Sequence, residues 1–165
     1  MACNITSGLA RDCRSNLGGV QYFYVTSDAI GDLTESAGEI TALSGTPTFY
    51  KFEMPRNSSS FTESGNFSLE SDTAFYQQDL TVSFSKMSAE KRNQLSLMGQ
   101  NTTLFVVFKD ENGSFFSIGA ERGAYLTAGG QQSGQALGDM NGMTMTITAT
   151  EPNPSYAVSA SVVGE

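Results

Sequence analysis

Residues 59–86 read SSFTESGNFSLESDTAFYQQDLTVSFSK, and this stretch decides the fold. Apolar and polar side chains alternate along it with a period of two, first over residues 61–71 and again over 76–85. Successive side chains of a β-strand point to opposite faces, so this period predicts two long strands. Only Glu63 and Gln78 interrupt the apolar side. We therefore predict a long hairpin with one apolar and one polar face.

The polar face of this hairpin carries hydroxyl, amide and carboxylate side chains, with no Lys or Arg before Lys86. A long two-faced strand pair can close into a barrel with copies of itself, which removes the exposed sheet edges. The polar face would then line a water-filled lumen. The predicted lumen-facing residues are Thr62, Ser64, Asn66, Ser68, Glu70, Gln77, Asp79, Thr81, Ser83 and Ser85.

The core is predicted from the apolar face of the hairpin and from three further segments. Residues 88–98 suit a helix, because Ser88 can cap its N-terminus and Gly99 can end it. The unbroken apolar run 104–108 fits a strand buried on both faces, and residues 143–150 alternate cleanly. The predicted core residues are Phe61, Phe67, Leu69, Leu80, Val82, Phe84, Leu95, Met98, Leu104, Val106, Phe108, Met145 and Ile147.

The chain divides into an extended N-terminal arm, residues 1–19, and a single β domain, residues 20–165. Residues 27–39 carry four acidic side chains and are interpreted as a solvated loop, with a metal-binding loop as the alternative. Further strands are predicted at 20–26, 39–43, 46–53, 115–118, 124–127 and 156–163. The predicted fold class is mainly β, an antiparallel sandwich or barrel with one α-helix.

The composition argues against much of enzymology. The chain has 165 residues, with 9 Lys and Arg against 17 Asp and Glu, so the net charge is 9 − 17 = −8, and it has no His. Without His there is no Ser-His-Asp triad, no Cys-His pair and no imidazole zinc ligand. The negative charge repels nucleic acid and anionic lipid at long range. We predict no enzymatic activity, no cofactor, no metal, no membrane partner and no specific DNA binding.

Weaker chemical patterns have simpler explanations. Glu70 and Asp79 could act as a glycosidase pair, but nothing in their spacing brings them together. Residues 110–113 and 139–142 resemble fragments of calcium loops, yet they lack the remaining ligand spacing and fit turns. Cys3 and Cys13 are interpreted as reduced thiols, with a disulfide between them left open. We expect neither a leader peptide nor a membrane-spanning segment.

Several segments of the chain form a recognisable series. They are 13–20 (CRSNLGGV), 49–53 (FYKFE) with 57–63, 75–86 with the 88–98 helix, 110–113 (DENG), and 133–142 (SGQALGDMNG) followed by Glu151 and Pro152. In their order and spacing, over most of the chain, these segments resemble those of the tail tube proteins of tailed bacteriophages. Met143 departs from the pattern, where an aromatic residue is expected after Gly142.

The resemblance implies a structural subunit of the virion tail that assembles in the host cytoplasm. It implies rings, usually of six copies, that stack into a tube, with sheath, terminator or baseplate proteins as further partners. An acidic lumen would repel phosphate, so DNA is expected as a passing cargo. The arm 1–19 and the loop 54–58 are predicted inter-ring contacts. Two other classes stay open: another phage neck, baseplate or decoration protein, and a β-sandwich carbohydrate-binding module or hydrolase.

Overall fold

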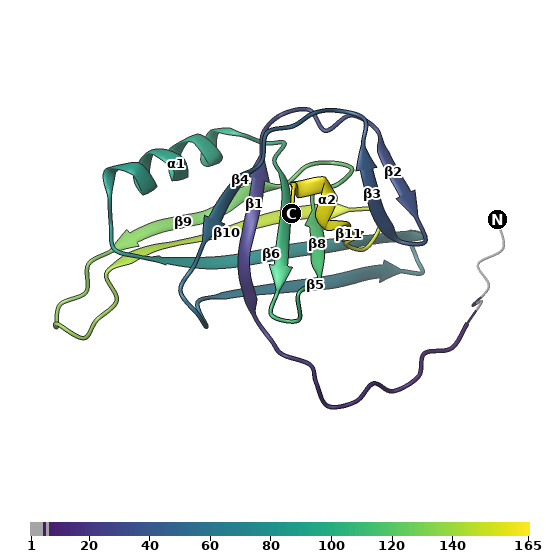
Figure 1. Cartoon of the computed structure of the whole chain (residues 1–165), viewed down its shortest axis with the longest axis horizontal. Coiled ribbons are helices and arrows are strands. Elements are labelled where there is room, and N and C mark those ends of the chain that lie inside the picture. The colour runs from purple at the N-terminus through teal and green to yellow at the C-terminus, as the bar shows by residue number, and fades with distance from the viewer. Residues whose placement is uncertain (1–4, 6) are drawn as a thin grey trace.

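The structure is a computed structural model that describes residue 5 and residues 7–165, and it is mainly β. A seven-stranded sheet, sheet A, has the order β2-β3-β11-β8-β7-β1-β4, and a four-stranded sheet, sheet B, has the order β5-β6-β10-β9. The strands of sheet A run across those of sheet B (Figure 1). The elements are β1 Val20–Thr26, β2 Leu33–Ser36, β3 Glu39–Leu43, β4 Tyr50–Glu53, β5 Ser59–Ser68, β6 Thr73–Ser85, α1 Ala89–Gln100, β7 Phe105–Asp110, β8 Phe115–Ile118, β9 Tyr125–Gln132, β10 Gly142–Glu151, β11 Ala157–Val158 and α2 Ala160–Val163.

The main core lies between the two sheets. It is built by alternate side chains of β1, β6, β7 and β10, together with the inner side of α1. Phe61 and Leu95 are partly buried and pack against it. The predicted core residues that are buried here are Leu80, Val82, Phe84, Met98, Leu104, Val106, Phe108, Met145 and Ile147. The β-sandwich with one long helix is therefore confirmed as the fold class.

Two predicted core residues are wrong. Phe67 is 69% exposed and Leu69 is 102% exposed. Both belong to the end of the β5–β6 hairpin, where every residue of β5 after Phe61 is exposed. Neither side chain packs against a hydrophobic core cluster, so alternation alone did not secure burial. Phe67 instead packs edge-on against Tyr76 within the hairpin, with ring centroids 5.7 Å apart.

The two polar interruptions of the hairpin's apolar side contact each other. Glu63 and Gln78 are directly paired across β5 and β6. The Gln78 side chain is 2% exposed and donates through Nε2 to Glu63 Oε2 at 3.1 Å. Gln78 Oε1 accepts from the backbone N–H of Gly119, and Glu63 Oε2 accepts from that of Ser155. These contacts satisfy the amide in the core, as a buried polar group requires.

Four predicted element boundaries are corrected. The predicted strand 46–53 is limited to β4, Tyr50–Glu53. The acidic loop 27–39 contains β2, which pairs with β3 as a short hairpin. The predicted strand 156–163 is only the two-residue β11, and the chain then turns into α2. The predicted strand 124–127 begins one residue later and continues to Gln132, because the Gly- and Gln-rich segment pairs with β10.

The predicted N-cap of the helix and one predicted turn are confirmed, whereas the predicted end at Gly99 is wrong, because α1 continues through Gly99 to Gln100 and Asn101 is its C-cap. Ser88 caps α1, where its Oγ accepts from the backbone N–H of Lys91. In the turn between β7 and β8, Asp110 Oδ1 accepts from the N–H of Ser114 at 2.7 Å. Such side-chain to backbone bonds are local, so sequence can anticipate them.

The described part of the arm forms neither helix nor strand before Gly19. Cys13 is exposed and has no disulfide partner among the described residues. Cys3 lies outside the described residues, so the structure does not bear on a disulfide between them.

Candidate functional site: the open face of sheet B

The outer face of sheet B is built by residues of four strands that share one direction of the pleat. On β6, Leu80, Val82 and Phe84 point into the core, so the residues between them point outward. Threonines of β10 pair with these outward-facing residues of β6. Thr148 lies opposite Asp79, Thr146 opposite Thr81, and Thr144 opposite Ser83. Directly opposite residues of paired strands lie on the same face. The face therefore combines the hairpin with β10.

A chain of hydrogen bonds crosses this face. Thr148 Oγ1 donates to Asp79 Oδ1 at 2.6 Å, and Gln77 Nε2 donates to Asp79 Oδ2 at 3.0 Å. Thr127 Oγ1 lies 2.9 Å from Thr148 Oγ1. Thr127 Oγ1 also donates to the backbone carbonyl of Thr146 at 3.3 Å. The network spans β6, β10 and β9 and holds the Asp79 carboxylate in place.

Nine of the ten predicted lumen-facing residues lie on the strands of this face. The even-numbered residues of β5 pair with odd-numbered residues of β6, for example Thr62 with Asp79 and Ser64 with Gln77. Glu70 is the exception, because it lies in the turn between β5 and β6 and not on either strand. The prediction also omitted a group of residues on β9 and β10. These are Thr127, Thr144, Thr146, Thr148 and Thr150.

The omission has a physical reason. The alternation of β10 identifies its threonine side, but the pairing of β10 with β6 joins residues more than 60 positions apart. Sequence periodicity describes one strand at a time and carries no information on which strand lies beside it. Only the tertiary structure places the threonines next to Asp79.

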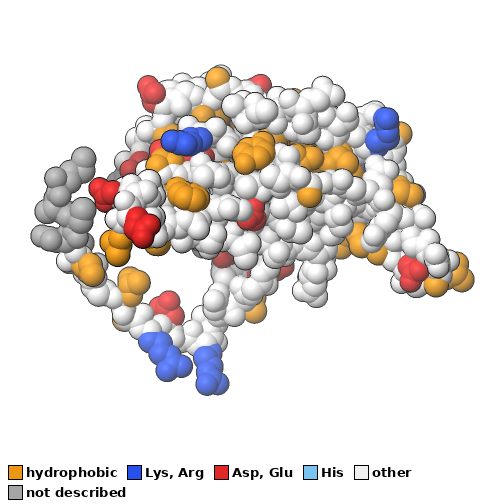
Figure 2. All heavy atoms as spheres, turned by 180° about the vertical axis from the view of Figure 1, so that it is seen from behind, with side chains coloured by type: hydrophobic (Ala, Val, Ile, Leu, Met, Phe, Trp, Pro, Cys, Tyr) orange, Lys and Arg blue, Asp and Glu red, His pale blue; other side chains and the backbone are white. Residues whose placement is uncertain are grey.

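The face is polar but carries little charge. Among the outward-facing residues of the four strands, all within the described chain, Asp79 is the one charged side chain. Figure 2 views the molecule from this side and shows few charged side chains over the middle of the face. The predicted acidic surface is therefore one carboxylate per copy among hydroxyl and amide groups, with Glu70 and Asp72 at the hairpin turn. The aromatic rings of Phe75 and Tyr125 also lie on this face, because they are paired with Asn66 and Thr148.

Sheet B has two free edges, β5 and β9. Its three strand pairs are all antiparallel, so β5 and β9 run in opposite directions. The sheet is also staggered. The β5 strand pairs directly with Thr73–Val82 of β6, whose midpoint is position 77.5. The β9 strand pairs with the part of β10 that lies opposite Asp79–Ser85 of β6, whose midpoint is position 82. The two edges are offset by 82 − 77.5 = 4.5 residues.

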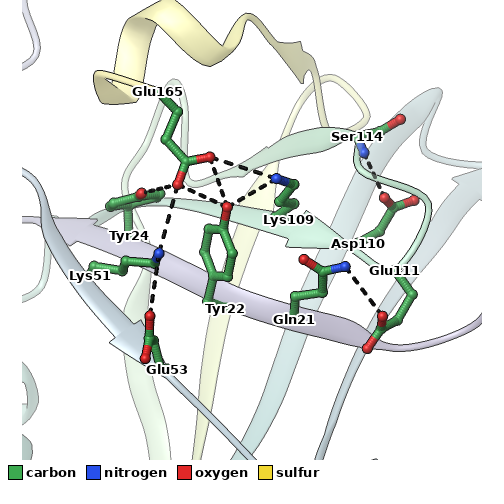
Figure 3. Close-up of polar contacts among 10 residues, drawn as sticks. All are labelled: Gln21, Tyr22, Tyr24, Lys51, Glu53, Lys109, Asp110, Glu111, Ser114 and Glu165. Carbon is green, nitrogen blue, oxygen red and sulfur yellow. Dashed lines mark hydrogen bonds and ion pairs between the residues drawn. The ribbon is translucent and has the colours of Figure 1, made fainter. Parts of the chain in front are cut away.

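The outer face of sheet A is closed in a different way (Figure 3). Glu165 accepts hydrogen bonds from the hydroxyls of Tyr24 at 2.6 Å and Tyr22 at 2.7 Å. Lys109 Nζ lies 3.6 Å and Lys51 Nζ 3.8 Å from its carboxylate oxygens. The Tyr24 and Tyr22 hydroxyls, followed by the two ammonium groups, hold the pKa of Glu165 below its usual value. Burial, followed by the Glu165 contact, raises the pKa of Tyr24. This cluster fastens the end of the chain to sheet A.

One carboxylate is buried at the end of β10. Glu151 is 3% exposed and accepts hydrogen bonds from the backbone N–H groups of Glu121 and Arg122. Burial raises the pKa of Glu151 despite these bonds. Its two acceptor oxygens are used to hold the loop before β9, which is a structural role. Within residue 5 and residues 7–165, no group of three or more Cys, Asp or Glu side chains is arranged to hold a metal ion.

The fold and this face define a β-sandwich with one sheet left uncovered and almost uncharged. Comparisons with protein-family models, with curated proteins and with solved structures give no match to this chain. In the described residues, no helix is long and apolar enough to cross a membrane.

Proposed function

We propose that this protein is a structural subunit of a bacteriophage tail tube, in which copies form rings whose lumen is lined by the open face of sheet B. One observation carries the proposal. An uncovered polar face with a single carboxylate and no basic residue lies on a sheet of even strand number with two free, staggered edges. The resemblance of the sequence to tail tube proteins agrees with it.

The strand directions suit ring closure. Because β5 and β9 are antiparallel, the β5 strand of a second copy placed beside β9 also runs antiparallel to it. Each added copy therefore continues the same alternation through a head-to-tail contact, which forms a ring when the rotation between copies closes. Closure pairs both exposed edges, which are otherwise sites for uncontrolled aggregation.

The stagger suits a barrel. An offset of 4.5 residues at about 3.3 Å each, across three strand spacings of about 4.8 Å, corresponds to a slope of about 45°. Strands of closed barrels are inclined at roughly 35–45° to the axis. Six copies would supply about 24 strands and a backbone radius of roughly 26 Å at this inclination. Barrels of 16–18 strands already enclose an aqueous channel.

The electrostatics suit passage of DNA rather than binding. Phosphate contacts from Lys and Arg supply most of the affinity of proteins for DNA. The open face offers none, and Asp79 adds one negative charge per copy. A chain of net charge −8 adds long-range repulsion. DNA would therefore move through such a lumen without being held.

Negative-stain electron microscopy of the concentrated protein tests the proposal. We expect rings and stacked tubes, whereas a protein that stays monomeric at high concentration would contradict it. Rings that never stack would favour a neck, baseplate or decoration protein. Binding of an oligosaccharide by a monomer would favour a carbohydrate-binding module.

A pair of proline variants tests which surface closes the ring. Ser64→Pro and Gly65→Pro both remove a backbone donor from the middle of β5. Successive residues of an edge strand point their N–H groups to opposite sides, so one variant damages the β5–β6 ladder and the other only the free edge. The variant that still unfolds cooperatively should fail to form rings. If it assembles like the unmodified protein, β5 is not the contact edge.

A further inference from the structure

A groove lies between β4 and α1, on the side of the molecule where sheet A ends. It has a volume of about 490 Å³ and is continuous in its lining with a smaller hollow of about 240 Å³. Phe52, Met98 and Leu104 form its apolar floor, and Leu97 of α1, 55% exposed, forms one wall. The groove is apolar at its base and open to solvent.

The other wall is an unpaired strand edge. The β4 strand is the last strand of sheet A on this side, and β1 is its one partner in the described chain. Phe52 points to the core, so Tyr50, two residues earlier, shares its side, while Lys51 and Glu53 point to the Glu165 cluster (Figure 3). A segment added to this edge would gain backbone hydrogen bonds and an apolar floor together, as in strand addition.

The N-terminal arm has the properties of such a segment. Ile5 is 96% exposed and Leu9 is 100% exposed, so neither packs on its own domain. Four residues apart, they fall on one side of an extended strand. Residues 1–19 carry two Arg and one Asp, a net +1, while the remainder carries −8 − 1 = −9. The arm and the domain are therefore complementary in charge.

The arm is directed away from its own groove. Asn112, in the turn after β7, accepts from the backbone N–H of Leu17 at 2.8 Å and donates to the Asn16 side chain at 2.8 Å and to the Leu17 carbonyl at 2.9 Å. In sheet A, β7 and β4 lie on opposite sides of β1. Figure 1 shows the arm leaving β1 on the side away from α1. These bonds favour a second copy as the occupant.

The proposed ring brings the two parts together. The base of the arm is attached beside β5, where Ser59 Oγ donates to the Val20 carbonyl at 2.8 Å. The α1 helix lies over β9, with Leu95 beside Gly129. Pairing of β9 with the β5 strand of the next copy therefore places the base of that copy's arm next to α1.

We propose that the groove between β4 and α1 binds the N-terminal arm of a neighbouring copy as an added strand on β4, with Leu9 on the floor formed by Phe52 and Met98. This inference rests on the proposed ring. It assigns the arm a defined acceptor and, in place of the predicted inter-ring contact, links adjacent copies of one ring through a second contact independent of sheet B.

Disulfide trapping tests the inference. In a Cys3→Ser, Cys13→Ser background, Leu9→Cys is combined with Leu97→Cys, or with Tyr50→Cys on β4 itself. Leu9, Leu97 and Tyr50 are all exposed, so the variants should keep the fold. The matched control combines Leu9→Cys with Ser96→Cys, one position along α1 and turned away from the groove. After mild oxidation we expect the groove pairs to form a ladder of covalent oligomers. The amount of cross-linked protein should be at least fivefold that of the control.

Electron microscopy of the same samples separates the two proposals. Rings with no ladder, or with equal ladders for groove and control, overturn the arm–groove contact and leave the ring intact. A disulfide confined to single chains at every dilution overturns the second copy as occupant. Monomers without any cross-link overturn both the contact and the tail tube assignment.

Discussion

The outer faces of the two sheets differ in what covers them. On sheet A, the chain's own C-terminal segment packs over an apolar cluster around Ile40, Phe105 and Val107, and Glu165 ties it down. On sheet B, the outer face stays open, with hydroxyl and amide groups and one carboxylate. Both sheets share one core. A face that a monomer covers is part of its stability, whereas an open polar face is free to serve an assembly.

The largest expected effect separates the two sides of β10. Ile147 is fully buried between the sheets, while Thr146 points to the open face. Ile147→Ala should lower the free energy of unfolding by about 2–5 kcal/mol, because it leaves a cavity in a close-packed core. Thr146→Ala should cost less than about 1 kcal/mol, since it removes one weak hydroxyl contact. Urea unfolding measures the free energy of unfolding of both variants. Equal losses of stability would contradict the assignment of Ile147 to the core side of β10 and of Thr146 to the open side.

An intermediate loss of stability is expected when the Glu165 cluster on the outer face of sheet A is disrupted. Glu165→Gln should cost about 1 kcal/mol at neutral pH, because the neutral amide removes the charge from the tyrosine hydrogen bonds and loses both ion pairs. The control Glu53→Gln removes a carboxylate that contacts only Lys51 in this cluster and is 74% exposed, and it should have a smaller effect. Thermal unfolding of the two variants gives the comparison.

The same residue predicts a pH dependence. Since the folded pKa of Glu165 lies below its ordinary 4.5, its contribution is complete above pH 4.5 and is lost as the pH falls through the lowered value. The unmodified protein should therefore lose more stability in this acidic window than Glu165→Gln does. If the free energy of unfolding falls equally steeply with pH in the two proteins, the Glu165 cluster does not stabilise the fold.

The smallest effect on stability is expected on the open face. Thr81→Lys should change the free energy of unfolding by less than about 0.5 kcal/mol, since the side chain is exposed. In assembled tubes, however, it should create salt-dependent retention of duplex DNA, because it adds a phosphate contact to the lumen. Ser96→Lys on α1 makes the same charge change off the face and should not. Equal DNA retention by both variants would argue against a lumen lined by sheet B.

The elements that could be predicted from the sequence are those with local causes. The period of two located the β5–β6 hairpin and β10, and Ser88 marked the start of α1. These signals depend on the pleat of one strand or on contacts within one turn, so they are present in the chain before it folds. Nine residues of the open face were predicted from them.

Only the tertiary structure decided what covers each face. Phe67 and Leu69 follow the apolar period but pack against neither core cluster and stay exposed. Glu63 and Gln78 break that period and satisfy each other across the hairpin. The threonines of β10 join Asp79 through a pairing of distant segments. Burial and pairing depend on which surfaces meet in space, and no periodicity along the chain contains that information.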